Sequence, residues 1–117
     1  MARLRSDFWV AAYLRRCSGE AVSAMLRRRG AAEAGAIMIK LDHLDGTAVL
    51  FGPAPQAEVD GRDSPRTFVR MHKQERIATP DAEAKLRREI DFDPDLWIIE
   101  VEDRNGRILI DEDVRPI

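Results

Sequence analysis

The clearest pattern of apolar and polar positions lies between residues 35 and 52, which read GAIMIKLDHLDGTAVLFG. In the middle of this stretch, Asp45-Gly46 suits the positive φ angles of a two-residue type I′ turn, and this predicts a β-hairpin. The turn sets a register in which Leu41 faces Leu50. Because side chains alternate along a strand, one face is then expected to carry Ile37, Ile39, Leu41, His43, Ala48 and Leu50, and the other Met38, Lys40, Asp42, Val49 and Phe51.

Two helices are predicted, one near the start of the chain and one in its second half. Ser6 is a suitable N-cap for a helix that covers residues 8–17 and ends at Gly19. Thr79-Pro80 is a second start signal, because a hydroxyl cap is followed by proline at the first helical position. The second helix must end before Pro94 and carries a narrow apolar stripe, which is typical of a surface helix lying on another element; the stripe consists of Ala82, Leu86 and Ile90.

Further strands are expected on both sides of the second helix. Residues 21–29 alternate between apolar and polar side chains and are interpreted as a strand, as are residues 67–72. Residues 96–104 and 107–111 flank Asn105-Gly106, which is a second type I′ pair, and they are predicted to form a second hairpin.

Carboxylates would face one another in this second hairpin. Glu100 would lie opposite Asp111, and like charges across a ladder are destabilising. We therefore expect either a bulge that shifts the pairing or a cation beside Glu100.

The order of these elements indicates the fold class. The two helices do not alternate with the strands, and residues 52–66, rich in proline and glycine, are expected to form a long loop. We predict a single α+β domain over residues 1–117. It contains an antiparallel sheet of about five or six strands, with both helices packed on one face.

Length and composition indicate one soluble domain. The chain has 117 residues, and its longest apolar run, residues 8–14, is far below the roughly 20 residues that cross a bilayer, so no membrane contact is expected. Arg15-Arg16 interrupts that run, so it does not resemble a secretory signal. The single cysteine, Cys17, is predicted to be a buried, inert thiol and fits a reducing compartment. We expect a cytoplasmic protein.

Charge is distributed unevenly along the chain. Residues 1–30 carry seven basic and two acidic groups, whereas residues 80–117 carry six basic and twelve acidic groups. The basic front and the acidic back are expected to recognise two different partners or each other, within one molecule or across a dimer.

Three stretches carry a resemblance that covers nearly the whole chain: RLRSDFWVAAYLRR (residues 3–16), LDGTAVLFGPAPQ (44–56) and FDPDLWIIEVEDRNGR (92–107). With these stretches the chain resembles a family of short alphaproteobacterial proteins classed as a domain of unknown function. The resemblance implies a bacterial, cytoplasmic, single-domain α+β protein. It implies no activity, cofactor or catalytic residue.

The two histidines, His43 and His72, are candidate binding residues. His43 lies near Asp42 and Asp45, and His72 lies near Glu75. Imidazole titrates near neutral pH and binds metals, so these groups suit a catalytic base or a metal ligand. Their spacing matches no metal-ligand pattern, however, and we predict neither a metal nor a cofactor. A structural or surface histidine is the alternative interpretation.

A basic cluster near the N-terminus suits a phosphate-binding surface; it comprises Arg3, Arg5, Arg15, Arg16, Arg27, Arg28 and Arg29. The isoelectric point of about 5.7 and the lack of interleaved aromatic residues argue against nucleic-acid binding. In a strand, Arg27 and Arg29 point the same way, and these two are kept as candidate binding residues.

An acidic group towards the C-terminus suits a divalent cation, because carboxylates are its preferred ligands; it comprises Glu100, Glu102, Asp103, Asp111, Glu112 and Asp113. It lacks the spacing of a calcium-binding loop, and a strand edge protected by charge is the better interpretation.

Pro53 and Pro55 follow the central hairpin and make a stiff corner at the start of the long loop. Such a corner suits recognition at low entropic cost, or it protects the sheet from aggregation.

The sequence therefore favours a non-catalytic module that binds a protein partner, a second copy or a small ligand. The enzymatic alternative uses a histidine and a carboxylate on an anionic or phosphorylated substrate. That alternative requires both groups in one pocket. Weak nucleic-acid binding through the N-terminal arginines is a second alternative.

Overall fold

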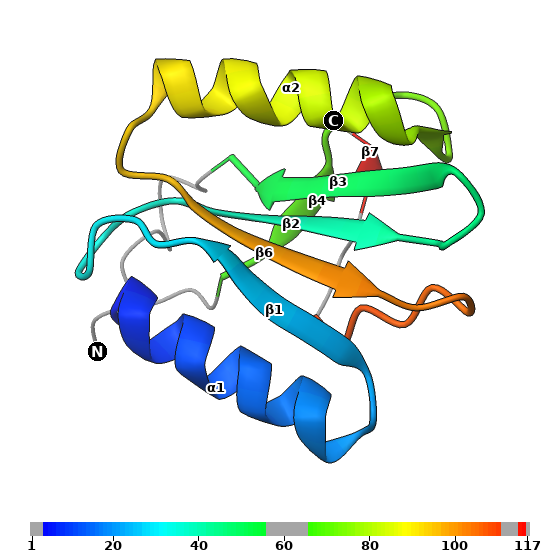
Figure 1. Ribbon diagram of the computed structural model, residues 1–117. Helices are drawn as coiled ribbons and strands as arrows, with labels where there is room; N and C mark the ends of the chain where they lie inside the picture. Colours follow the sequence, from blue (N-terminus) through cyan, green and yellow to red (C-terminus); the bar gives the residue numbers. More distant parts are fainter. Residues whose placement is uncertain (1–3, 56–65, 111–114, 117) are drawn as a thin grey trace.

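The computed structural model describes residues 4–55, 66–110 and 115–116. Two helices and seven strands follow one another along the chain (Figure 1): α1 (Ser6–Gly19), β1 (Ser23–Arg28), β2 (Ile37–Asp42), β3 (Thr47–Pro53), β4 (Phe68–Arg70), β5 (Ile77–Ala78), α2 (Thr79–Phe92), β6 (Trp97–Glu102) and β7 (Arg115–Pro116). The predicted α+β class is confirmed, as are the predicted strands that became β1 and β4. Neither helix of the described residues has the length and apolarity that a membrane crossing requires.

The strands form one mixed sheet in the order β1-β6-β2-β3-β4-β7, and the short strand β5 also pairs with β3. β1 pairs with β6 in antiparallel fashion, as β3 does with β2, β4 and β5. β2 and β6 are parallel, as are β4 and β7. The sheet is therefore mostly antiparallel rather than wholly so, and a strand from late in the chain lies between two early ones.

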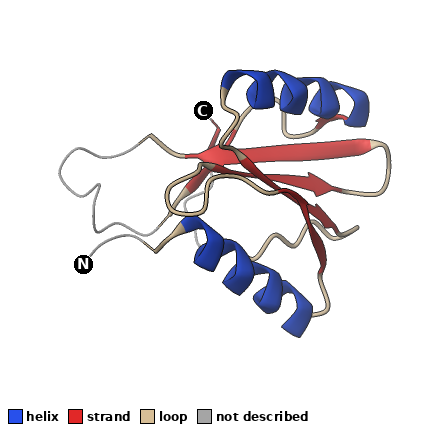
Figure 2. Cartoon of the chain, turned by 60° about the vertical axis from the view of Figure 1, so that its left-hand side comes forward, coloured by secondary structure: helices blue, strands red, loops and turns tan. Residues whose placement is uncertain are grey.

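The two helices cover opposite faces of the sheet, so the prediction that both pack on one face is wrong. Figures 1 and 2 show the sheet as the middle layer between α1 and α2. Val10 and Tyr13 of α1 pack in one cluster with Ile39, whereas Leu86 of α2 packs in another with Met38. Consecutive residues of a strand point to opposite faces, and β2 is apolar on both. Each face therefore needs its own cover.

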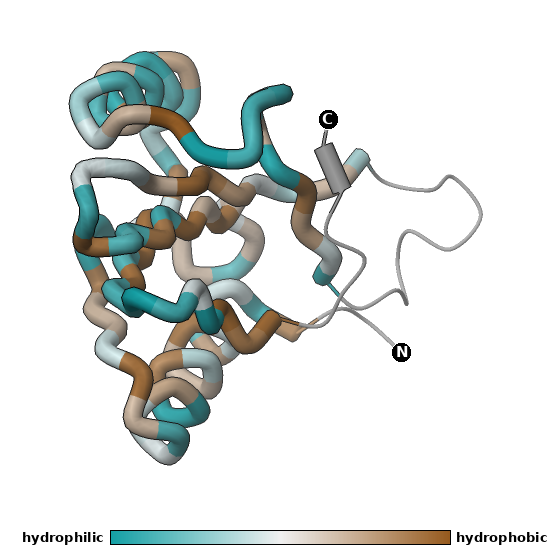
Figure 3. The backbone as a smooth tube through the Cα atoms, turned by 90° about the vertical axis from the view of Figure 1, so that its right-hand side faces the viewer, coloured by the Kyte–Doolittle hydropathy of each residue, from teal (hydrophilic) through white to brown (hydrophobic). Residues whose placement is uncertain are grey.

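Two hydrophobic cores follow from this layering, and Figure 3 shows many of the apolar segments along the strands between the helices. The α1-side core contains Val10, Tyr13, Cys17, Val22, Ile37, Ile39, Leu41, Val49, Phe51, Phe68, Trp97, Ile99 and Val101. The α2-side core contains Met38, Ala48, Leu50, Ala82, Leu86, Leu96 and Ile98. Burial of one large apolar side chain contributes about 1.5–3 kcal/mol, so packing on both faces holds the layers together.

The central hairpin forms as predicted, but its register is shifted by one residue. Leu41 lies opposite Val49 rather than Leu50. The shift places Val49 and Phe51 in the α1-side core and places Ala48 and Leu50 in the α2-side core. A slip of one residue exchanges the two faces of a strand. Because β3 is apolar on both faces, the hydrophobic pattern did not determine which register forms.

The loop of this hairpin contains three residues, not two. The N–H of His43 donates to the carbonyl of Thr47 (3.1 Å), which closes the loop around residues 44–46. Leu44 and Gly46 both have positive φ angles, of 61° and 88°. The carboxylate of Asp45 accepts a hydrogen bond from the backbone N–H of Thr47 (3.0 Å) and stabilises the loop.

The predicted second hairpin is wrong, although the chain does turn after β6. Gly106 has a φ of 75°, but residues 106–110 belong to no strand. Both edges of β6 are already occupied, by β1 and β2, so no edge is left for a returning strand. The segment instead packs against the α1-side core, where the hydroxyl of Tyr13 donates to the carbonyl of Ile108. Asp111 lies outside the described residues.

Both predicted helices are confirmed, with small differences at their starts. Ser6 lies inside α1 rather than capping it, and its hydroxyl donates to the carbonyl of Gly35 (2.6 Å). This bond ties the start of α1 to the segment before β2. Thr79 is the first residue of α2, and Ala78 occupies the cap position.

Candidate ligand site

A pocket of about 230 Å³ opens where β2, β3 and β4 meet the segment that follows β4. It is lined by His43, Val49, Phe51, Arg70, Glu75 and Arg76. Val49 and Phe51 belong to the α1-side core, so the pocket lies on that face of the sheet. Its lining combines an apolar floor with two cations, one carboxylate and one imidazole.

His43 contributes a buried ring with incomplete hydrogen bonding. It directly follows β2, and the alternation of the strand places it on the same face as Leu41. The residue is only 8% exposed. Its Nδ1 atom is buried and has no hydrogen-bond partner among the described residues. Buried polar atoms normally have a partner, so this nitrogen is a candidate contact for a ligand.

Gly106 and the turn after β6 hold the His43 ring from one side. A Cβ atom at position 106 would lie 2.9 Å from Cε1 of His43, so only glycine allows this approach. Asp103 fixes the turn, because its carboxylate accepts a hydrogen bond from the N–H of Arg107 (2.9 Å) and its carbonyl accepts one from the N–H of Gly106 (3.1 Å). Its pairing with the Arg107 guanidinium lowers the pKa of Asp103.

Arg70 is the cation of the pocket that is held by backbone carbonyls. It lies opposite Phe51 in the β3–β4 ladder. Its Nε and Nη2 atoms donate to the carbonyls of His72 (3.1 Å) and Lys73 (3.2 Å). Within the described residues it forms no ion pair. Its orientation is therefore fixed, and no carboxylate of the described residues neutralises its charge.

Arg76 and Glu75 complete the rim of the pocket. Nη1 of Arg76 lies 3.1 Å from a carboxylate oxygen of Asp45, in a pair whose two side chains are about half exposed, so solvent weakens the attraction. Glu75 is exposed and has no ion-pair partner among the described residues. The lining as a whole carries a net positive charge.

His72 lies outside the pocket and has a structural role. Its Nε2 atom accepts a hydrogen bond from the N–H of Leu50 (3.1 Å), and its Nδ1 atom lies 2.8 Å from the carbonyl of Gln74. Nδ1 must therefore carry the proton of a neutral ring. Burial lowers the pKa of His72, which keeps this neutral form. Both nitrogens already have backbone partners.

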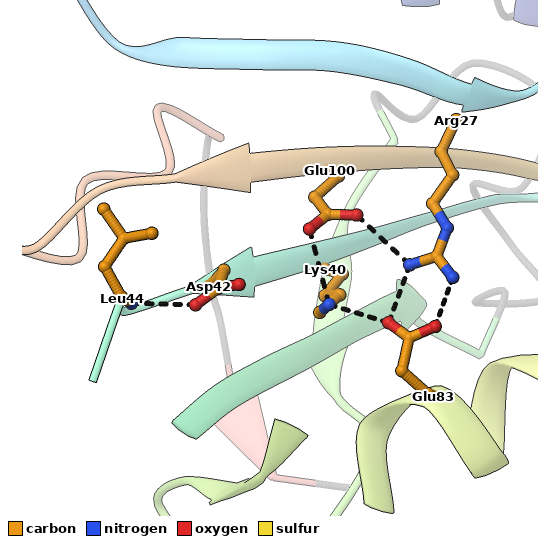
Figure 4. A network of polar contacts seen from close by, with 6 residues as sticks. All are labelled: Arg27, Lys40, Asp42, Leu44, Glu83 and Glu100. Atoms are coloured by element: carbon orange, nitrogen blue, oxygen red, sulfur yellow. Dashed lines mark hydrogen bonds and ion pairs between the residues drawn. The ribbon is translucent and has the colours of Figure 1, made fainter. Parts of the chain in front are cut away.

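Arg27 joins a network of charges on the opposite face of the sheet (Figure 4). Its guanidinium pairs with both carboxylate oxygens of Glu83 on α2, and its Nη1 atom lies 3.1 Å from Glu100 on β6. Lys40, only 4% exposed, pairs with the same two carboxylates at 2.7 and 3.3 Å. A cation was one of the two alternatives expected for Glu100, and two cations lie there, although the hairpin that motivated the expectation does not form. The basic front and the acidic back of the chain meet here within one molecule.

The network shifts the pKa values of Glu83 and Lys40. Hydrogen bonding to Arg27, followed by that to Lys40, lowers the pKa of Glu83 to about 2. Burial acts to lower the pKa of Lys40, but the two carboxylates together raise it. Arg27 and Lys40 therefore fasten α2 to β1, β2 and β6.

The other predicted binding residues lie apart from the pocket. The guanidinium of Arg29 lies 5.3 Å from the ring centroid of Trp97, which is a cation–π contact. Pro53 is the exposed last residue of β3, opposite Phe68, and Pro55 is exposed two residues later. Residues 56–65 of the predicted loop lie outside the described residues. His43 is thus the only predicted site residue that lines the pocket.

Sequence reasoning missed the two arginines of the pocket. Arg70 lies in a predicted strand, and Arg76 follows in the polar stretch His72–Arg76. In that stretch only His72, with Glu75 near it, was a candidate. The density of charge in this stretch, directly after a strand, was the available signal.

Two carboxylates of the predicted acidic group, those of Glu100 and Glu102, come together with that of Asp42 on β2. Oxygens of Asp42, Glu100 and Glu102 lie within 4.8 Å of one another. Glu100 already pairs with two cations, and Asp42 accepts a hydrogen bond from the N–H of Leu44 (2.8 Å; Figure 4). Internal partners therefore already occupy much of this group.

Comparison with known proteins identifies the family. A crystal structure and an NMR structure of DUF1491 family proteins from Caulobacter crescentus CB15 are 36% and 38% identical to the chain, with TM-scores of 0.76 and 0.78, and each comparison covers 95% of this chain and 96% of the other. The solution structure of protein Atu0922 from A. tumefaciens is 33% identical, with a TM-score of 0.73, and covers 95% of this chain and 89% of the other. No curated protein matches. Both organisms are alphaproteobacteria, which confirms the resemblance found in the sequence. The family model described as "Protein of unknown function (DUF1491)" matches residues 4–111, and the chain belongs to this family.

Proposed function

We propose that the protein is a non-catalytic module that binds a small molecule in the pocket beside His43. The observation that carries this proposal is that His43 lines the pocket while its buried Nδ1 atom has no hydrogen-bond partner among the described residues. A ligand atom in the pocket would supply the missing hydrogen bond. The single buried cysteine supports a cytoplasmic location, where thiols stay reduced.

The volume supports a small ligand. Pockets for drug-sized molecules measure about 300–1,000 Å³. At about 230 Å³, this pocket suits a molecule smaller than a nucleotide.

An enzyme is the second candidate, because His43 and Glu75 line the same pocket. General acid–base catalysis works best when a second group orients the histidine. No described residue forms a hydrogen bond that orients the His43 imidazole. Binding without catalysis is therefore better supported.

Association with a protein partner or a second copy stays a prediction of the sequence. Phe8, Met25 and Phe92 are exposed apolar side chains, but they lie on three different elements, α1, β1 and α2.

Protein-detected NMR with a library of small organic fragments tests the proposed function. We expect fragments to shift the backbone signals of His43, Val49 and Phe51. Glu75→Trp should narrow the exposed rim of the pocket and abolish these shifts, whereas Arg87→Trp, an exposed position on α2, should retain them. Fragments that bind only elsewhere, or no binding fragment at all, would contradict the proposal.

A further inference from the structure

The charge of the pocket indicates the class of its ligand. Two guanidinium groups and one carboxylate line it, and one of the guanidinium groups, Arg76, is already paired with Asp45. Arg70 has no carboxylate partner among the described residues. Its Nη1 atom makes no hydrogen bond with them, while Nε and Nη2 are anchored by two carbonyls. A fixed guanidinium with free N–H groups is suited to an oxyanion.

His43 adds a second polar contact from the other side of the pocket. Its imidazole is held by the close approach of Gly106. A ring nitrogen that carries a proton donates a hydrogen bond, and an oxyanion next to a guanidinium is a strong acceptor. His43 therefore suits the same ligand group as Arg70.

The floor of the pocket is apolar. Val49 and Phe51 line it. Each residue is only 6% exposed, so most of its surface is already packed inside the protein. A hydrocarbon or aromatic group on this floor would gain about 25 cal/mol for each Å² of apolar surface that it buries. The ligand is therefore expected to have an apolar part as well as a charge.

We propose that the pocket binds a small organic anion, with its oxyanion at Arg70 and His43 and its apolar part on Val49 and Phe51. The oxyanion is a carboxylate or a phosphate monoester, because both present the oxygens that a guanidinium binds. This proposal rests on the proposed function, since it names the ligand class of the same pocket.

Titration with matched probes tests the anion directly. Benzoate and benzamide have the same size and differ in charge, and phenyl phosphate and inorganic phosphate differ in the apolar ring. We expect benzoate, phenyl phosphate or both to shift the NMR signals of His43 and Phe51. Benzamide should bind at least about tenfold more weakly, the loss expected for one charge-assisted hydrogen bond. Binding of benzoate alone assigns a carboxylate, and binding of phenyl phosphate alone assigns a phosphate monoester.

Variants separate the role of Arg70 from a general effect of charge. Arg70→Gln should weaken the binding of the anionic probe by about tenfold or more, and Arg70→Lys should recover part of it. Arg87→Gln removes the same charge from the opposite side of the sheet and should have no effect. If Arg70→Gln does not fold, His43→Phe removes the second contact and should weaken binding in the same direction.

Other outcomes overturn the proposal in distinguishable ways. Equal affinity for benzamide and benzoate would overturn the anion but leave the pocket as a binding site. Equal affinity for inorganic and phenyl phosphate would overturn the apolar contact with Phe51. If neither these probes nor the neutral fragments bind at His43, the proposed function fails as well.

Discussion

Gly106 packs against the edge of the His43 imidazole, so closely that a methyl group at position 106 would lie 2.9 Å from Cε1. The contact joins the turn after β6 to the end of β2. The position of the ring in the pocket therefore depends on a residue that does not itself line the pocket.

Gly106→Ala should displace this ring. The φ of 75° already disfavours alanine by about 1–2 kcal/mol, and the new methyl group also collides with His43. We expect lower stability in urea denaturation together with shifted ring signals of His43 in NMR spectra.

Gly46→Ala is the matched control for Gly106→Ala. Gly46 has a φ of 88°, but a Cβ atom there meets nothing within 4 Å. Gly46→Ala should therefore lose a similar amount of stability through its backbone conformation, whereas the NMR signals of the His43 ring should not shift. Unchanged ring signals in Gly106→Ala would contradict the contact.

Glu83 should make stability dependent on acidic pH. The pKa of this carboxyl is about 2 in the folded protein and has its ordinary value of 4.5 in the unfolded chain. Above pH 4.5 both states are charged, and the full stabilisation is present. As the pH falls from 4.5 towards 2, only the unfolded chain takes up the proton, so the stabilisation is lost.

Glu83→Gln should therefore cost about 2–3 kcal/mol at neutral pH, and its difference from the wild type should shrink towards pH 2. Urea denaturation at several pH values measures this. Glu89 lies on the same helix and forms no ion pair among the described residues. Glu89→Gln should therefore change the free energy of unfolding little. A difference for Glu83→Gln that stays constant with pH would refute the ion-pair network as its cause.

His72 should contribute to stability above its ordinary pKa of 6.5. Because burial lowers its pKa in the folded state, the native ring stays neutral while the unfolded chain takes up a proton as the pH falls below 6.5. Stability should therefore fall below pH 6.5 and level off once the native ring is protonated.

His72→Phe should cost about 1–3 kcal/mol at pH 7.5, because the N–H of Leu50 loses its acceptor. His72→Gln keeps an acceptor and should lose less stability. The difference in unfolding free energy between the wild type and His72→Gln should decrease from pH 7.5 to pH 5.5. A difference independent of pH would show that the buried ring does not titrate as described.

Cys17 should react only when the protein unfolds. The residue is fully buried in the α1-side core, and burial raises the pKa of its thiol. With Ellman's reagent at pH 8, the reaction rate should follow the rate of unfolding and rise steeply in urea. Met25→Cys in a Cys17→Ala background places a thiol at a half-exposed strand position and should react at once. Rapid reaction of native Cys17 would contradict its burial.

Local signals in the sequence predicted most of the elements. The start signals Ser6 and Thr79-Pro80 located both helices to within a residue or two, although neither hydroxyl acts as a cap, and Asp45-Gly46 located the central hairpin. These signals act over a few residues and need no knowledge of the rest of the chain. The class of fold followed from their order.

Properties that depend on distant pairing were not predictable in the same way. The nearly continuous apolar run of β2, residues 37–41, is typical of a strand buried on both faces, so its pattern alone does not decide which residues face which helix. The register of β3 and the placement of the helices were wrong for the same reason. The second hairpin was wrong because the edges of β6 are taken by strands far away in sequence.

The candidate site also combines a residue that a local signal identified with residues that only distant pairing brings together. His43 was identified because histidine carries chemistry in any context. Arg70 and Arg76 reach the pocket only through the pairing of β4 with β3 and the path of the following segment, which the sequence does not reveal. Arg27 was expected at a binding surface, but its charge is used inside the molecule by Glu83 and Glu100.

The insertion of β6 between β1 and β2 also affects when the chain can fold during its synthesis. β1, β2 and β3 leave the ribosome before β6, which follows α2 in the chain. Until β6 has been translated, β1 lacks the one neighbour with which it pairs among the described residues. Long-range pairing of this kind is slow to form and leaves strand edges exposed meanwhile. The sheet therefore cannot be completed before β6 has been synthesised.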